Sequence, residues 1–219
     1  MNTTDDGYPD YSSGEKVADG IVHLLGVIAA IVGATALIIW AAIGATGGEI
    51  AAVSIYGTGL ILTFVASALY HMTPWERLRP IFRRVDHAAI FVMIAGTYTP
   101  FVVMLGTTSS YIVLAAIWSI AAIGVVRKLF FWQVQGWGGV LLYLAMGWMG
   151  IGVIWTLFGL LPVLASAMIV AGGLLYTVGV VFYRWEALKF SNAIWHGFVL
   201  AASACFYIAI TLGVGQVAV

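Results

Sequence analysis

Residues 67–101 decide the fold and read SALYHMTPWERLRPIFRRVDHAAIFVMIAGTYTPF. The stretch leaves one apolar run, passes through a basic loop and enters a second apolar run that contains Pro100. Two prolines in the loop prevent one continuous helix, because proline lacks the backbone donor that a helix interior needs. Ser67, His71 and Asp86 lie beside the apolar runs, where polar groups are costly and tend to be functional. The stretch therefore predicts two membrane helices that meet at a polar site.

The composition of the whole chain agrees with a membrane location. Of the 219 residues, 63% are hydrophobic and only 8% are charged, and the mean hydropathy is +1.05. Soluble domains carry roughly a quarter charged residues, so this composition indicates an integral membrane protein. The net charge of zero argues against a nucleic-acid partner bound through charge. The single cysteine excludes an intramolecular disulfide.

Apolar runs of about 20 residues match a hydrocarbon core of about 30 Å, whereas barrel strands would alternate over about 10 residues. There are seven such runs, at 21–45, 51–71, 86–105, 111–126, 138–157, 163–183 and 192–214. We predict an all-α integral membrane protein, with a seven-transmembrane helix bundle over residues 21–219. Residues 1–20 are polar and acidic and are expected to form a disordered tail without a cleavable signal peptide.

The basic residues give the orientation of this bundle. All nine Lys and Arg residues fall in the tail or in the second, fourth and sixth loops, which lie on one side of the membrane. Cytoplasmic loops carry the excess of Lys and Arg, so this side is the cytoplasm. The N-terminus is therefore predicted to be cytoplasmic and the C-terminus to be outside.

The histidines share one depth in this topology. Asp86 and all four histidines are predicted within one or two turns of the cytoplasmic face, the histidines being His23, His71, His87 and His196. Ser67 and His71 are four residues apart and share one helix face, as do Asn192 and His196. Neutral imidazoles with one carboxylate are ligands that Zn(II) takes in catalytic sites, which leave one position to water. Ser67 could hydrogen-bond that water or a developing oxyanion.

Each of these residues also has a structural alternative. His71 could cap the C-terminal end of its helix, where a donor is favourable. Asp86 could be an N-cap or pair with the two arginines before it. His196 could make a hydrogen bond between helices.

Three further residues are assigned roles around the site rather than in it. His87 points away from Asp86 on a helix and is interpreted as interfacial or as a second layer around the site. His23 is interpreted as second-layer or structural rather than as a ligand. Pro100 removes one backbone bond of its helix, so it predicts a kink that either widens a cavity or only bends the helix.

Several motifs together resemble the bacterial hemolysin III family. They are EKVADGIVH at 15–23, Ser67-x3-His71, RVDHAAIF at 84–91, IAGTYTPF at 94–101 and NAIWH at 192–196. That family belongs with the progestin and adipoQ receptors and, more distantly, with alkaline ceramidases. The resemblance covers nearly the whole membrane region. It implies a seven-helix bundle in the bacterial inner membrane with a cytoplasmic N-terminus.

The resemblance also implies a Zn(II) site near the cytoplasmic leaflet. His71 and His196 would be ligands, Asp86 would hold the metal or its water, and Ser67 would lie beside them. One position departs from the pattern, because the relatives' seventh helix carries His-x3-His and this chain has Asn192 in the first place. Asn192 could be a weak ligand, His23 or water could substitute for it, or tight metal binding could be lost.

Three functions follow from these features. The first is metal-assisted hydrolysis of a lipid amide or ester, with a ceramide-like lipid or a phospholipid as substrate and a role in membrane lipid homeostasis. The second is a non-enzymatic lipid sensor with a structural polar or metal site. The third, a pore-forming cytolysin, is suggested by the family's name. The sequence argues against it, because the helices look permanently inserted and no amphipathic segment suits a soluble form.

Overall fold

The computed structural model describes residue 8 and residues 11–131, 137–185 and 187–217. Within these residues every regular element is a helix. In chain order they are α1 (Ser13–Gly44), α2 (Gly47–Met72), α3 (Arg79–Leu105), α4 (Thr108–Phe130), α5 (Trp137–Met149), α6 (Ile151–Leu157), α7 (Val163–Arg184) and α8 (Ser191–Val217). Six of these helices are long and apolar enough to cross a membrane.

The predicted fifth membrane run differs from the structure. The sequence predicts one helix over 138–157, but the chain forms α5 and α6, which meet at Gly150. Tyr98 of α3 reaches this break, where its hydroxyl accepts a hydrogen bond from the Gly150 amide at 3.2 Å and donates one to the Gly147 carbonyl. Backbone groups that a helix break releases inside a membrane need such partners. A side chain from another helix therefore stabilises the interruption.

Several helices begin earlier than predicted, and the difference is largest for α1 and α3. α1 begins at Ser13 rather than at 21, because Ser12 and Glu15 form a reciprocal capping box. α3 begins at Arg79 rather than at 86, with Pro80 in its first turn, where proline needs no donor. α3 also continues through Pro100, which lies in the half of the helix remote from Asp86.

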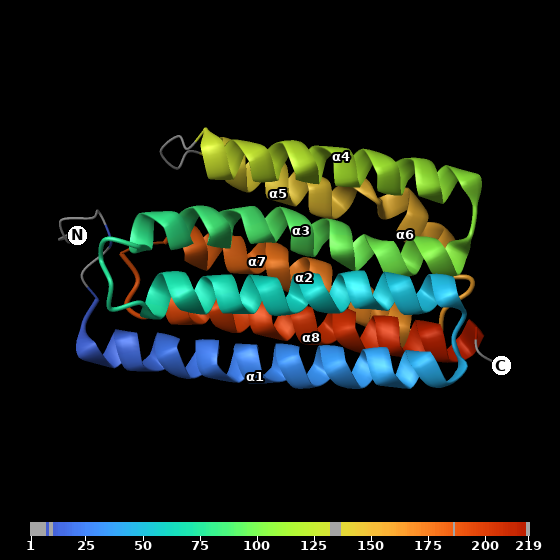
Figure 1. The fold of residues 1–219 in the computed structure, drawn as a ribbon, viewed down its shortest axis with the longest axis horizontal. Coiled ribbons are helices and arrows are strands. Elements are labelled where there is room, and N and C mark those ends of the chain that lie inside the picture. Colours follow the sequence, from blue (N-terminus) through green and yellow to red (C-terminus); the bar gives the residue numbers. More distant parts are fainter. Residues whose placement is uncertain (1–7, 9–10, 132–136, 186, 218–219) are drawn as a thin grey trace.

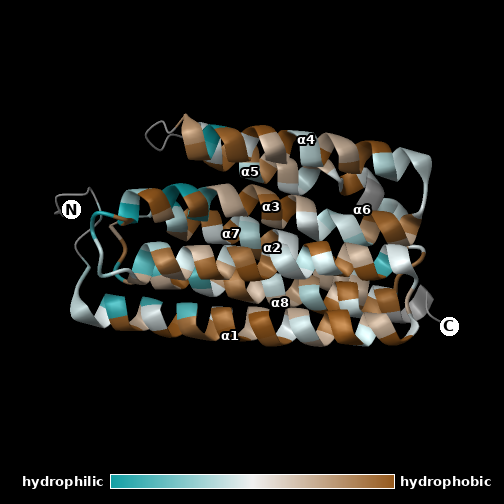
Figure 2. Ribbon diagram, in the orientation of Figure 1, coloured by the Kyte–Doolittle hydropathy of each residue, from teal (hydrophilic) through white to brown (hydrophobic). Residues whose placement is uncertain are grey.

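The helices form one bundle with α2 and α3 at its centre (Figure 1). The larger apolar core lies between these two helices and α1, α7 and α8, and a smaller one lies between α3, α4 and α5. Large apolar side chains also cover the outside of the helices, as expected for a surface that faces lipid. Figure 2 shows that hydrophilic residues concentrate at the end of the bundle that carries the N-terminus. The polar site lies at this end.

Candidate metal centre

Three histidines from three helices converge at this end of the bundle. His23 comes from α1, His71 from the last turn of α2, and His196 from the second turn of α8. One potential ligand atom of each lies within 4.8 Å of the others. The ring centroids are 4.2 Å apart for His23 and His196, 4.6 Å for His71 and His196, and 5.2 Å for His23 and His71. Histidine ligands from three separate helices are thus in reach of a single ion.

Asp19 sets the protonation of two of these rings. Nδ1 of His23 donates to the Asp19 main-chain carbonyl at 2.8 Å, and Nδ1 of His196 donates to Asp19 Oδ1, also at 2.8 Å. Carbonyl and carboxylate oxygens only accept, so both Nδ1 atoms carry hydrogen. In the neutral rings the Nε2 atoms are therefore left with lone pairs, the form that binds a metal.

The two Nε2 atoms face the same hydroxyl. Ser67 Oγ lies 3.2 Å from His23 Nε2 and 3.4 Å from His196 Nε2, and the Asp86 carboxylate lies beside the same hydroxyl. Ser67 has one proton to give to these three acceptors. The lone pairs around Ser67 therefore outnumber the hydrogens available to them, and imidazole nitrogens beside a carboxylate fit a divalent cation such as Zn(II).

The third ring faces the protein surface. His71 Nδ1 lies 3.0 Å from the Tyr8 hydroxyl and 3.2 Å from Nδ2 of Asn192. Tyr8 is only 8% exposed, and the Arg79 guanidinium lies over its ring at 4.5 Å. Burial raises the pKa of Tyr8 above its ordinary value, so the phenol stays protonated at neutral pH. The protonated hydroxyl can therefore donate to His71 Nδ1, or accept from it when Nε2 of His71 is the ligand atom.

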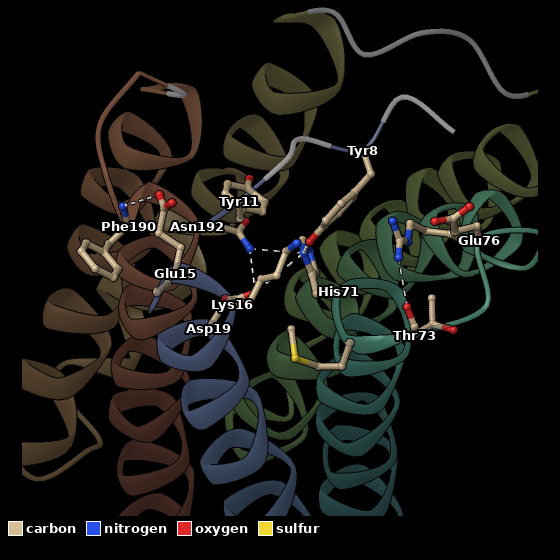
Figure 3. Close-up of a pocket in the computed structure, with 13 residues that line it drawn as sticks. Tyr8, Tyr11, Glu15, Lys16, Asp19, His71, Thr73, Glu76, Phe190 and Asn192 are labelled. Atoms are coloured by element: carbon tan, nitrogen blue, oxygen red, sulfur yellow. Dashed lines mark hydrogen bonds and ion pairs between the residues drawn. The ribbon is translucent and has the colours of Figure 1, made fainter. Parts of the chain in front are cut away.

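A cavity of about 290 Å³ connects this site to the surface. Figure 3 shows Tyr8 and Tyr11 beside it, with His71, Asp19 and Asn192 along its wall. The lining comes from the tail, the start of α1, the end of α2 and the segment before α8, which all lie at the same end of the bundle. Water or a polar head group could reach His71 by this route.

The structure brings most of the predicted site residues together, and it changes the role assigned to one histidine. Ser67, His71, Asn192 and His196 lie in one hydrogen-bonded cluster through Asp19. Asp86, which the sequence predicted to hold the metal or its water, lies beside Ser67 and is not one of the three potential ligands. His23, which the sequence assigned to a surrounding role, lies among the three potential ligands instead.

His87 lies outside the histidine cluster. Its Nδ1 donates to the Arg83 carbonyl at 2.7 Å and lies 3.5 Å from Asp86 Oδ2. It is therefore not one of the three convergent rings.

Sequence reasoning missed the roles of Asp19 and Tyr8. For Asp19 a signal was present, because Asp19 and His23 have the same four-residue spacing as Ser67 and His71. For Tyr8 the sequence held no such signal, because its contact with His71 depends on the path of the N-terminal segment.

The fold and the site together define a helical membrane protein with a polar histidine cluster at one end. The chain belongs to the haemolysin-III related family, whose model matches residues 13–207. It is 37% identical to the Hemolysin-3 homolog of Bacillus subtilis (strain 168) over 194 residues, which are 88% of this chain and 91% of that relative.

Two further relatives extend the comparison. Hemolysin-3 of Bacillus cereus is also 37% identical over 194 residues, 88% of this chain and 89% of the relative. The human monocyte to macrophage differentiation factor is 32% identical over 164 residues, 71% of this chain and 67% of the relative. The family resemblance of the sequence motifs is confirmed.

Proposed function

We propose that this protein is a zinc-dependent membrane hydrolase that acts on a lipid amide or ester and serves membrane lipid homeostasis. The observation that carries this proposal is the convergence of His23, His71 and His196 beside Ser67 and Asp86. Such a site combines metal ligands with a hydroxyl and a carboxylate, which are the groups that hydrolysis of a carbonyl compound requires.

In this proposal His23, His71 and His196 hold the metal. A bound zinc ion would polarise a substrate carbonyl and lower the pKa of water. Asp86, which lies beside Ser67, would accept a proton from water as general base. The Ser67 hydroxyl would donate a hydrogen bond to the developing oxyanion.

The proposed topology has seven crossings, with α5 and α6 together counted as one. The N-terminus lies in the cytoplasm, and the membrane is the bacterial inner membrane. The polar end that carries the N-terminus supports this orientation (Figure 2), because it also carries the basic loops. A substrate would then reach the site from the cytoplasmic leaflet.

Elemental mass spectrometry of the detergent-purified protein tests the metal site. We expect close to one zinc ion per chain in the wild type and its loss in His23→Ala, His71→Ala and His196→Ala. His87→Ala is the matched control, since His87 bonds to the Arg83 carbonyl outside the cluster, and it should keep its zinc. Folded wild-type protein that takes up no added zinc would refute the site.

Turnover is tested separately with panels of ceramide-like lipids and phospholipids. Ser67→Ala should retain zinc and lose most of the hydrolysis, because Ser67 is proposed to act on the substrate rather than to bind the metal. A zinc-loaded wild type without turnover on any of these lipids would contradict the hydrolase.

One observation favours a second function, a non-enzymatic lipid sensor. Each of the three histidines already has a hydrogen-bond partner within the protein, so the cluster can be stable without a catalytic role. A sensor predicts that His71→Ala lowers thermal stability while Ser67→Ala behaves as the wild type. Lipid binding without turnover would also support the sensor.

A further inference from the structure

We propose that Asp19 is the positioning residue of this site and that Asn192 holds Asp19 in place rather than binding the metal. The inference rests on the proposed function, because it assumes that the histidines hold a metal. It assigns a role to the helix position at which this chain departs from the His-x3-His pattern of its relatives.

Asp19 is the carboxylate on which all three rings converge. Its side-chain oxygens lie 2.8 Å from Nδ1 of His196, 3.5 Å from Nδ1 of His23 and 3.9 Å from Nδ1 of His71. The residue is only 4% exposed. The Nδ1 atoms of the three histidines therefore face Asp19, and the Nε2 atoms of His23 and His196 face Ser67.

A single residue fixes two imidazoles in this arrangement. The main-chain carbonyl of Asp19 accepts from His23, and its side chain accepts from His196. Histidine ligands commonly donate their second N–H to a carboxylate or carbonyl, which fixes the tautomer and the ring orientation. Asp19 makes both kinds of contact, and both leave Nε2 directed toward Ser67.

Asn192 completes the arrangement from α8. Its Nδ2 donates to Asp19 Oδ2 at 2.8 Å, while Oδ1 of the same carboxylate accepts from His196. Both oxygens of Asp19 are thus held by α8 residues four positions apart, so the carboxylate cannot rotate freely. The same Asn192 nitrogen lies 3.2 Å from Nδ1 of His71, so the amide of Asn192 is turned with its donor, and not its oxygen, toward Asp19 and His71. The amide nitrogen of Asn192 therefore serves as a donor to the Asp19 carboxylate.

Asn192 donates and Asp19 accepts in this hydrogen bond, so the inference can be tested by exchanging the two residues. In Asp19→Asn the new amide can accept from His196 through its oxygen, but its nitrogen then faces the nitrogen of Asn192. In Asn192→Asp two carboxylates meet at the former hydrogen bond. The double variant Asp19→Asn/Asn192→Asp restores one donor and one acceptor with their positions exchanged.

The experiment measures zinc dissociation constants of the purified full-length chain by competition with a chromophoric chelator. Thermal unfolding without metal establishes that each variant is folded, and the Co(II) absorption spectrum reports the coordination. We expect each single variant to bind zinc 10- to 100-fold more weakly, as for other residues that orient metal ligands. The double variant should recover most of this loss. Glu49→Gln, which changes an equally buried carboxylate at the far end of α2, should bind as the wild type.

The outcomes separate this inference from the function it rests on. A wild type that binds no zinc overturns both. A wild type that binds zinc, with folded single variants that bind it equally well, overturns the role of Asp19 and leaves the metal site standing. A folded double variant that binds no better than the single ones overturns the pairing with Asn192. If Asp19→Asn does not fold, Asn192→Ala should still weaken zinc binding, and unchanged binding there overturns the pairing.

Discussion

Tyr8 is a residue at which the N-terminal segment meets the candidate site. Its ring contacts Tyr11, Tyr70 and His71 edge-on or nearly so, and its hydroxyl lies against His71 Nδ1. The aromatic contacts hold the ring, and the hydroxyl adds a hydrogen bond to His71. Removal of the hydroxyl should therefore separate these two contributions.

We expect Tyr8→Phe to lower the free energy of unfolding by about 1 kcal/mol, the usual net contribution of one hydrogen bond. Because burial raises the pKa of Tyr8, the bond is fully present below the ordinary tyrosine pKa of about 10 and is lost only as the pH rises through the higher value of the folded protein. The difference from wild type should therefore stay constant between neutral and mildly alkaline pH. Thermal unfolding in detergent measures it.

Tyr111→Phe is the matched control, since Tyr111 is 45% exposed and removed from the site. It should leave the unfolding temperature unchanged. A Tyr8→Phe protein as stable as this control would show that the bond to His71 contributes nothing.

The sequence predicted the common depth of the histidines but not how they are connected. Membrane spans and basic loops place residues along the bilayer normal, so His71 and His196 could be assigned to one face of the membrane. The relative orientation of the rings depends on how the helices pack. Helix packing brings His23 to the other two histidines and places Asp19 between them.

At the scale of the elements, the break between α5 and α6 depends on one side chain. Tyr98 bonds to the backbone on both sides of the break, at Gly147 and Gly150. We expect Tyr98→Phe to lower the free energy of unfolding by about 1–3 kcal/mol, because the buried Gly150 amide and the part-buried Gly147 carbonyl lose their partner. Thr97→Val is the control, since the Thr97 hydroxyl bonds only within its own helix, to Met93.

Thermal unfolding of the two variants should therefore differ, with Tyr98→Phe the less stable. Equal stability would mean that the break does not depend on Tyr98.

The same break explains where the fold prediction failed. The length of the apolar run predicts that 138–157 lies in the membrane. The sequence does not indicate at which of the several glycines in and beside this run the helix is interrupted. Only the approach of α3 selects Gly150 as the interruption, and this contact joins residues 52 positions apart. The other membrane helices were predictable because each is a long apolar run, whereas several first turns, such as the start of α2 after the capping Thr46, lie outside the apolar run and were missed.

For the whole molecule, the proposed topology can be tested by cysteine labelling. The chain has one cysteine, Cys205, which can first be replaced by alanine. Single cysteines at Ser109 and Leu160 should react with a membrane-impermeant maleimide in intact cells, and one at Arg77 only after permeabilisation. These positions are exposed and lie at opposite ends of the bundle.

Two results would contradict this topology. Labelling of Arg77→Cys alone in intact cells would reverse the proposed orientation. Protection of Leu160→Cys together with Arg77→Cys would mean that α5 and α6 do not complete a crossing.

The cavity that reaches His71 is lined by residues at the end of the bundle that carries the N-terminus, several of which Figure 3 labels. Access to the site is therefore one-sided. In sealed vesicles of known sidedness, an impermeant chelator would strip the metal only from those that display the N-terminal face. The pool of metal ions on that side of the membrane, and not the pool on the other side, would determine whether the protein is loaded.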